Sequence, residues 1–249
     1  MNFRRLFTSS SVICMLLGVF AFYYARPITI LCYAKWKARN APEMWVVPKP
    51  LSDITLSAAN GRKFSYFGYE FEVPWTEVKQ ERKLQSIAIV NFSNGAVVTI
   101  LNPVGELGEL QILQKEAAKR GRDVKAVFGE DASRSNYSLR SKILNLTPRD
   151  LRFFSSRQEM VSDSILLILK SIWTKRIKGG LYSFQTEWLH GFQEGGPAED
   201  KMVIIEAWDA NDRKMEVWIG SEPRAPKFSQ AEVNRILFSL RPISPSPPQ

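Results

Sequence analysis

The side chains that could perform chemistry are few and scattered in this sequence. His190 is the only histidine among 249 residues, so it cannot build a histidine-based metal site. No cysteine or evident nucleophile lies near it, and we expect it to be structural or solvent-facing rather than a general base. Glu70 and Glu72 alternate with apolar residues and would lie on one face of a strand. They could pair for acid–base work or bind a cation, but a solvated face is the simpler interpretation.

The stretch Asp209-Ala-Asn211-Asp212 begins like a calcium-binding loop. However, Arg213 occupies the next ligand position and no glutamate follows at the required distance, so a hairpin turn explains the stretch better. No glycine-rich phosphate loop, nucleophile elbow or dinucleotide fingerprint occurs. We therefore expect no catalytic residue, no cofactor and no metal site. Cys14 and Cys32 are the only cysteines, so a disulfide framework is not expected in the remainder of the chain.

An apolar N-terminal segment is the clearest feature of the chain. Residues 6–25 read LFTSSSVICMLLGVFAFYYA, twenty residues without a charge, and such a helix would be about 30 Å long, enough to cross a bilayer once. The run ITILCYA at 28–34 could extend it. A cleaved signal peptide is less favoured, because Tyr23 stands where a small residue should precede a cleavage after Ala25. A buried helix of a soluble domain is the third alternative.

Basic residues are concentrated next to this apolar segment. Residues 1–41 hold six basic and no acidic residues, and the rest of the chain is nearly balanced, with 28 basic and 25 acidic residues. The basic residues that follow the segment mildly favour a cytoplasmic domain. Nucleic acid is not an expected partner, because the chain is tethered at a membrane and no aromatic stacking platform accompanies the basic residues.

Turn-forming and proline-rich stretches divide the chain. We expect a membrane anchor at 1–39, an extended tether at 40–62, one water-soluble domain at 63–242 and a disordered proline-rich tail at 243–249.

Within the domain, alternating apolar residues and turn signals predict strands, with a hairpin turn at Asn94-Gly95. The predicted strands are 69–73, 86–92, 96–101, 125–128, 182–188, 202–208 and 214–219, with a brief pairing of 239–241. Capping residues predict helices at 102–120, from 147, at 156–178 and at 229–238. Strands outnumber helices and their connections are mostly short, which predicts an α+β fold with an antiparallel sheet covered by helices.

Several of these stretches occur in similar order in one known family. YFGYEFEVPW, SIAIVNFSNGAVVTI, GLYSFQTEW, KMVIIEAWDANDRKMEVWI and AEVNRILFSLRP together resemble the PsbP type of domain over residues 64–242. The resemblance implies an α/β/α sandwich and a non-enzymatic assembly or binding role. It also implies that the domain lies outside the cytoplasm, whereas the charge count favours the cytoplasm. The side of the membrane therefore stays open, and we expect an extracytoplasmic domain.

A basic block lies in the middle of the domain. Residues 115–178 contain 15 basic and 7 acidic residues, which indicates a solvated helical surface or a patch for anionic lipid or an acidic partner. The residues expected to form such a patch are Lys115, Lys119, Arg120, Arg122, Lys175, Arg176 and Lys178. The sequence thus predicts a single-pass, membrane-tethered, non-catalytic module that binds a protein or anionic lipid. The alternative is a membrane-anchored hydrolase with an unrecognised site.

Overall fold

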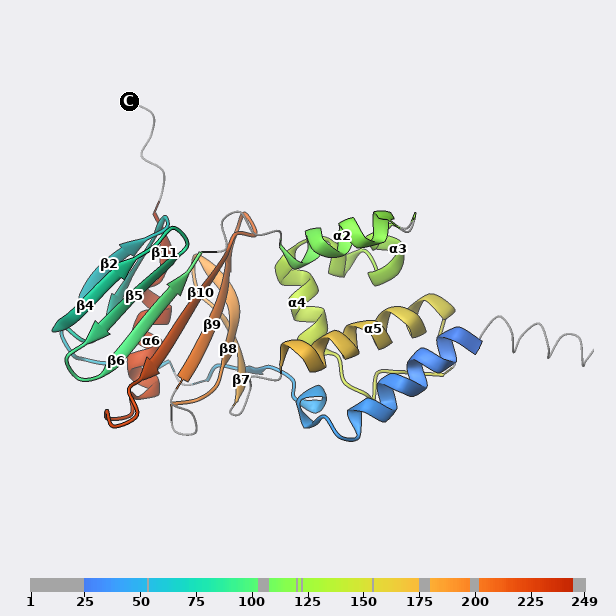
Figure 1. The fold of residues 1–249 in the computed structure, drawn as a ribbon, viewed down its shortest axis with the longest axis horizontal. Coiled ribbons are helices and arrows are strands. Elements are labelled where there is room, and N and C mark those ends of the chain that lie inside the picture. Colours follow the sequence, from blue (N-terminus) through green and yellow to red (C-terminus); the bar gives the residue numbers. More distant parts are fainter. Residues whose placement is uncertain are drawn as a thin grey trace, which may run out of the picture.

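The protein has an α+β fold with a large, mostly antiparallel sheet, as the sequence predicted. Figure 1 shows the sheets and a group of helices side by side along the long axis of the molecule. The structure is a computed structural model that describes residues 25–52, 54–102, 108–119, 121, 123–153, 155–174, 180–197 and 202–243.

The large sheet has eight strands within the described residues, in the order β1-β7-β8-β9-β10-β6-β5-β4. All neighbouring strands pair antiparallel except β1 and β7, which are parallel. The strands are β1 (Lys49–Pro50), β4 (Val78–Lys83), β5 (Ile87–Phe92), β6 (Ala96–Leu101), β7 (Leu181–Gln185), β8 (Leu189–Glu194), β9 (Met202–Asp209) and β10 (Lys214–Ser221).

A smaller sheet and one helix cover one face of the large sheet. The small sheet consists of β11 (Arg241–Pro242), β3 (Tyr69–Val73) and β2 (Arg62–Tyr66), and α6 (Gln230–Ser239) packs on β3. Alternate residues of β5, β6, β9 and β10 point into the shared core, as a period of two requires. The two sheets and α6 are called the β lobe below.

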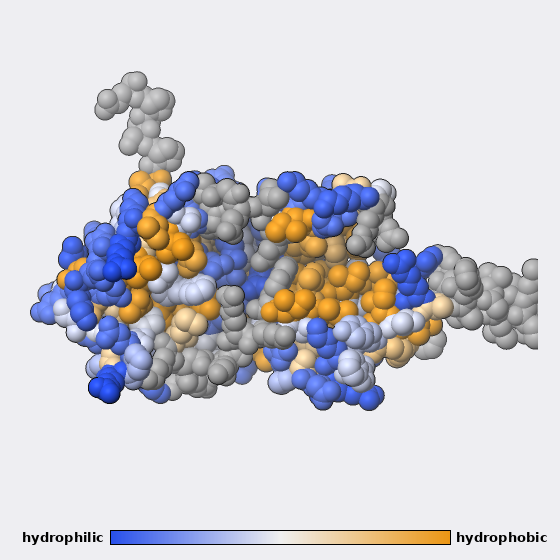
Figure 2. Space-filling model, viewed as in Figure 1, coloured by the Kyte–Doolittle hydropathy of each residue, from blue (hydrophilic) through white to orange (hydrophobic). Residues whose placement is uncertain are grey.

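The remaining helices form a second core of their own. This helical lobe contains the helix at 25–38, η1 (Pro42–Trp45), α2 (Glu109–Lys119), α3 (Val124–Phe128), η2 (Asp131–Ser133), α4 (Asn136–Asn145) and α5 (Arg157–Trp173). Its core joins residues of all these helices, including Leu31, Met44, Leu110, Leu139 and Leu166. Figure 2 shows hydrophobic residues gathered on the visible face of this lobe, with hydrophilic residues at its edges.

The helical lobe contacts the β lobe through α4. Leu144 of α4 packs with Leu181, Phe192 and Trp208 in a third, smaller cluster. Phe192 pairs with Glu206, and Glu206 and Trp208 alternate along β9 with Ile205 and Ala207, which belong to the core on the α6 side. Phe192 and Trp208 therefore point to the opposite face of the large sheet. The junction of the two lobes therefore lies on the outer face of β7–β9.

The expected tether at 40–62 is extended for most of its length but is bound along the domain. Met44 is buried in the helical lobe, and β1 pairs with β7. Further on, the side chains of Asn234 and Arg235 in α6 donate to the carbonyl oxygens of Thr55 and Ser57 at 2.9 and 2.5 Å. The segment therefore links both lobes and is not a free spacer.

None of the helices in the described residues is both long and apolar enough to cross a membrane. The predicted span at 6–25 lies outside these residues except for Ala25. Residues 28–34, considered as its extension, belong to the helix at 25–38, where Leu31 and Ala34 are fully buried in the helical lobe. Packing within the domain thus accounts for the apolar character of this stretch. The tail predicted to be disordered also lies outside the described residues, apart from Ile243.

Several local predictions are confirmed. The strands predicted at 69–73, 86–92, 96–101, 202–208 and 214–219 are β3, β5, β6, β9 and β10, and the brief C-terminal pairing is β11 on β3. Gly95 has a φ of +81°, as the predicted hairpin turn requires. The capping boxes of α5 (Ser156 with Glu159) and α6 (Ser229 with Glu232) are both present.

Two local predictions are wrong, and a third is right only in part. Residues 125–128 are helical, because the side chain of Asp123 caps α3 by accepting from the backbone of Lys125. No helix starts at Thr147: the carboxylate of Asp150 accepts from the backbone and hydroxyl of Thr147 and closes a turn. The strand predicted at 182–188 ends at Gln185, and β8 follows after a tight turn.

Candidate functional site

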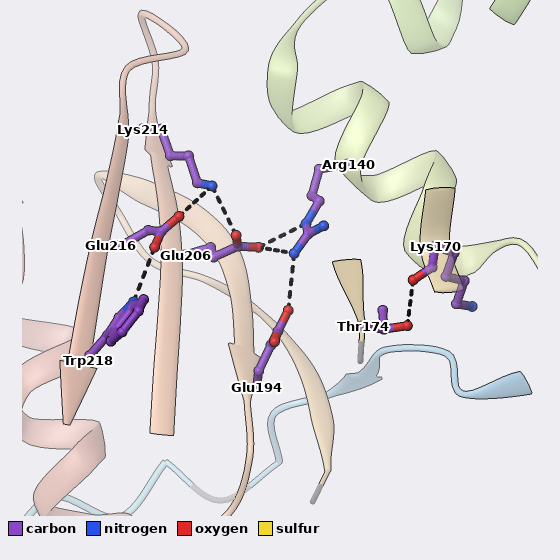
Figure 3. Close-up of polar contacts among 8 residues, drawn as sticks. All are labelled: Arg140, Lys170, Thr174, Glu194, Glu206, Lys214, Glu216 and Trp218. Carbon is purple, nitrogen blue, oxygen red and sulfur yellow. Dashed lines mark hydrogen bonds and ion pairs between the residues drawn. The ribbon is translucent and has the colours of Figure 1, made fainter. Parts of the chain in front are cut away.

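The most concentrated set of charged side chains lies buried at the junction of the two lobes. Arg140 on α4 donates from Nε to Oε2 of Glu206 at 2.9 Å and from Nη2 to Oε1 of Glu194 at 3.1 Å (Figure 3). Glu194 lies on β8 and Glu206 on β9, both on the outer face of the sheet. The three side chains are only 5–8% exposed.

The cluster continues along β10. Nζ of Lys214 lies 2.9 Å from Oε1 of Glu206 and 2.6 Å from Oε1 of Glu216, and the indole of Trp218 donates to Oε2 of Glu216 at 3.1 Å. Residues 214, 216 and 218 share a face because strand side chains alternate, and Glu216 pairs directly with Glu206 across the ladder. We call Arg140, Glu194, Glu206, Lys214 and Glu216 the junction cluster.

The junction cluster contains three carboxylates but two cations. Burial and the neighbouring charge of Glu206 raise the pKa of Glu194 to about 7, and Arg140 offsets this only in part. Burial would also raise the pKa of Glu206, but Arg140 and Lys214 both bind this carboxylate and hold its pKa below the ordinary value. As the pH falls through about 7, a proton on Glu194 therefore removes the surplus negative charge.

Perturbed carboxylates can mark a catalytic site, but the geometry here favours a structural role. Each carboxylate oxygen named above faces a cation or an indole donor of the protein, and the central side chains are buried. A substrate would have to break these ion pairs to reach them. The cluster therefore fixes α4 to the sheet.

Lys170 is a second buried cation near the junction. Its Nζ donates to the carbonyl oxygens of Leu144 and Leu146, at 2.7 and 2.6 Å, where α4 ends. Burial lowers the pKa of Lys170 to about 8, although Asp150 opposes the shift. A cation at this position satisfies carbonyl groups left without helical partners and complements the helix dipole. Figure 3 also shows Thr174, whose hydroxyl donates to the carbonyl oxygen of Lys170 at 2.6 Å.

His190 is the second residue of β8. Its ring centroid is 4.0 Å from that of Tyr137, and burial lowers the pKa of His190 despite the negative charges of Asp212 and Asp209. Asp212 does not act as its partner in a catalytic pair: its carboxylate accepts from the backbone amides of Asn136 and Tyr137 at 2.7 and 3.1 Å. This geometry favours the structural role expected for His190.

The carboxylate of Asp209, at the turn between β9 and β10, is hydrogen-bonded to groups of the domain itself. Asp209 accepts from the backbone amides of Asn211 and Arg213, from Nε of Arg213 at 2.6 Å and from the hydroxyl of Tyr69 at 3.2 Å. Burial and Asp209 raise the pKa of Tyr69 to about 12. In the part of the chain that the structure describes, no group of three or more histidine, cysteine, aspartate or glutamate side chains is placed to hold a metal ion.

Glu70 and Glu72 line an open groove of about 350 Å³. Its other walls are formed by Lys63, Phe71, Glu187, Trp188, Phe238, Ser239 and Arg241. Both carboxylates are engaged, Glu70 by Arg241 and Glu72 by Arg235 at 2.6 Å. The hydroxyl of Ser239 is also engaged, since it accepts from the backbone amide of Glu72 at 2.7 Å. The groove therefore brings the two glutamates together, but as parts of ion pairs.

The basic block contains both exposed and buried residues. Lys115 and Lys119 lie on the exposed side of α2, and Lys119 pairs with Glu116. The other five residues expected in the patch, Arg120, Arg122, Lys175, Arg176 and Lys178, lie outside the described residues. Arg140 and Lys170 also contribute to the count, yet both are buried in internal contacts. Part of the excess of basic over acidic residues in this block thus stabilises the fold through internal contacts.

Sequence reasoning missed the junction cluster, although one signal of it was available. Glu206 stands inside the run MVIIEAW, and a charged residue within a buried strand normally has a buried partner. Comparisons of this chain with protein-family models, curated proteins and solved structures found no match.

Proposed function

We propose that this protein is a membrane-tethered, non-catalytic binding or assembly module. The observation that carries the proposal is the way the chain enters the domain. The uncharged segment 6–25 leads directly into the helix at 25–38, and Leu31, Ala34 and Ala38 of that helix are buried in the helical lobe. An anchor at 6–25 would therefore hold the domain close to the membrane surface, without a flexible spacer.

The described titratable groups support a binding role over catalysis. Glu194, Glu206 and Lys170 have perturbed pKa values, but all three are buried. The partners of Glu194 and Glu206 hold the lobes together, and Lys170 binds the end of α4 within the helical lobe. His190 packs on an aromatic ring, and Glu70 and Glu72 pair with arginines. A catalytic site needs such groups to converge on space that a substrate can enter.

We also propose that the domain is a PsbP-like α/β/α sandwich. In support, α6 lies with the small sheet on one face of the large sheet, while α4 packs on the outer face at β7–β9. The resemblance also supports an extracytoplasmic location. Fold alone does not assign a function, so the binding role rests on the surfaces described here.

A surface for a protein partner is available on the outer face of the sheet beyond the helical lobe. Trp218 of β10, Thr99 of β6 and Ile89 of β5 stand side by side in register, and Leu101 and Ile87 form the next row. All five residues are only half-buried, and they point away from the core. Half-exposed apolar and aromatic side chains on a rigid sheet are typical of protein-binding surfaces.

Three experiments test the proposal. Alkaline carbonate extraction should leave the full chain in the membrane fraction, and protease added to sealed spheroplasts should digest the domain if it is extracytoplasmic. A photo-reactive amino acid at Ile89 should then form a discrete cross-linked product in membranes, whereas the same residue at Lys125, on the exposed side of α3, should not. Release of the full chain by carbonate would overturn the tethering.

A membrane-anchored hydrolase is the alternative, and the groove at Glu70 and Glu72 favours it to a limited degree. Under this alternative, the purified protein turns over an ester, amide or glycoside, and Glu72→Gln abolishes turnover without changing the melting temperature. Under the binding proposal, Glu72→Gln changes only stability, because the ion pair with Arg235 is lost.

A further inference from the structure

Four aromatic side chains are exposed where the chain enters the helical lobe. Tyr33 and Trp36 on the helix at 25–38 are 49% and 59% exposed, and Trp45 of η1 and Phe153, which precedes α5, are each 45% exposed. Burying such rings is strongly favourable, so a group of them in water indicates a surface that meets something else.

Contacts between the segments hold the rings of Phe153 and Trp45 in place. Nζ of Lys35 lies 5.0 Å from the ring centroid of Phe153, and Cζ of Arg149 lies 5.9 Å from that of Trp45. The indole of Trp45 also donates to the carbonyl oxygen of Ala38 at 2.9 Å. The helix, η1 and the 149–153 segment thus present one preorganised surface, which we call the aromatic–cationic strip.

The strip is basic as well as aromatic. The helix, the residue after it and the 149–153 segment contribute Arg26, Lys35, Lys37, Arg39, Arg149 and Arg152. The acidic residues of these segments and of η1 are Asp150 and Glu43, and the carboxylate of Asp150 accepts two hydrogen bonds from Thr147. The partner that fits this surface carries negative charge and has an apolar layer that admits aromatic rings.

We infer that the aromatic–cationic strip lies in the interfacial layer of an anionic lipid bilayer. The inference deepens the proposed function and rests on it, because an anchor at 6–25 would bring the bilayer directly to this end of the domain. Tryptophan and tyrosine favour the headgroup level, and lysine and arginine add electrostatic attraction to anionic lipid. The helix at 25–38 buries one side in the lobe and turns Cys32, Tyr33 and Trp36 outward, the arrangement of an interfacial helix.

This surface differs from the one that the charge count predicted. The residues predicted for lipid binding were those of the basic block, of which Lys115 and Lys119 are described and lie on α2. In the aromatic–cationic strip, by contrast, the rings and the cations come from the helix at 25–38, with which the described chain starts, and from η1 and the 149–153 segment, which contact that helix. Replacing Lys115 and Lys119 by glutamine is therefore the matched control for removing cations of the strip.

Cys32 provides a native probe, because it is exposed on the outward side of the helix and Cys14 is the only other cysteine. The full chain with Cys14→Ser is labelled at Cys32 with an environment-sensitive fluorophore and reconstituted into vesicles of zwitterionic lipid, with or without phosphatidylserine. Nitroxide-labelled lipids then report the depth of the fluorophore by quenching. A chain with Cys14→Ser, Cys32→Ser and Ser93→Cys carries the label at the exposed β5–β6 turn instead.

We expect shallow nitroxides to quench the Cys32 label strongly and the Ser93→Cys label hardly at all, with more quenching in phosphatidylserine vesicles. Replacing both Lys35 and Arg149 by glutamine should lower the equilibrium constant for docking on anionic lipid by about thirty-fold, because each cation contributes roughly 1 kcal/mol of attraction. Replacing both Lys115 and Lys119 by glutamine should have little effect on this constant.

Two outcomes would overturn the inference. If the chain floats with the vesicles but the Cys32 label stays in water, or is quenched equally in both lipids, the strip does not dock on anionic lipid and the tethering stands. If the chain does not float with either type of vesicle, the tethering itself fails.

Discussion

Arg140 of α4 and Glu206 of β9 form a buried ion pair, with Nη2 and Oε2 2.8 Å apart, across the junction of the helical and β lobes. The contact joins residues 66 positions apart in the sequence. Both side chains are desolvated, so the loss of either one would leave the other as an unpaired buried charge and would weaken the contact between the lobes.

We expect Arg140→Met to destabilise the protein by about 3–5 kcal/mol, because it leaves Glu194 and Glu206 buried without their shared cation. Chemical denaturation of the protein would measure the change. Arg134→Met is the matched control: Arg134 is exposed and pairs with the exposed Asp131, so we expect a change of less than about 1 kcal/mol. Equal effects of the two changes would contradict the structural role of the junction cluster.

The raised pKa of Glu194 predicts a specific dependence of stability on pH. This pKa is about 7 in the folded protein against 4.5 for an ordinary glutamate, so the folded state holds a proton that the unfolded state releases between these values. The stabilisation linked to that proton is complete below pH 4.5 and is lost as pH rises through 7.

Glu194→Gln should remove this part of the pH dependence, because glutamine mimics the protonated acid. The free energy of unfolding of the variant, compared with that of the unchanged protein, should be similar near pH 4.5 and higher near pH 8. The gain should be at most about 3 kcal/mol, the equivalent of the full shift of the pKa. A constant difference between the two proteins over this range would show that Glu194 titrates normally.

Lys170→Met should cost about 2–5 kcal/mol, because the carbonyl oxygens of Leu144 and Leu146 would lose a common donor in a buried site. Thermal or denaturant unfolding measures the loss. Lys125→Met on the exposed side of α3 provides a control that removes the same charge without a buried partner. If both variants unfold alike, Lys170 does not cap α4 in solution.

Elements specified by neighbouring residues could be predicted from the sequence. The capping boxes at Ser156 and Ser229 and the turn at Asn94-Gly95 act over two or three positions, and all three are present. The alternation in β9 and β10 likewise follows from one buried face.

Features that depend on distant residues could not be predicted in this way. The start of α4 is held by Asp212, which lies 76 residues away from Asn136 in the sequence. Its local signal, Ser135 as the N-cap, is weaker than a capping box, and α4 was not predicted. The burial of Arg140 and Lys170 could not be predicted for the same reason, because both residues find their partners only in the folded chain.

Asp212 should stabilise the start of α4 from the turn between β9 and β10. Its carboxylate accepts from the backbone amides of Asn136 and Tyr137 and from Nδ2 of Asn136. Asp212→Ala should cost about 1–2 kcal/mol and speed hydrogen exchange at these two amides. Asp212→Asn keeps an acceptor and suits the positive φ of 58° at this position, so it should retain much of the protection. Unchanged exchange in Asp212→Ala would contradict the capping role.

Gly191 of β8 should be the glycine least tolerant of a side chain near the junction. A Cβ at this position would lie 2.0 Å from the carbonyl oxygen of Glu206 and 2.8 Å from the ring of Phe184, so the strand carrying Glu206 would have to move. We expect Gly191→Ala to destabilise the protein by about 1–3 kcal/mol or more, since overpacking forces backbone shifts.

Gly196→Ala is the matched control, because a Cβ there meets no heavy atom within 4 Å. Denaturant unfolding of both variants at pH 6 and pH 8 would test more than packing. If the shift of β9 loosens the contacts of Glu206 in the junction cluster, Gly191→Ala should also weaken the pH dependence attributed to Glu194, whereas Gly196→Ala should leave it intact. A destabilised Gly191→Ala protein with unchanged pH dependence would mean that the cluster tolerates movement of the sheet beneath it.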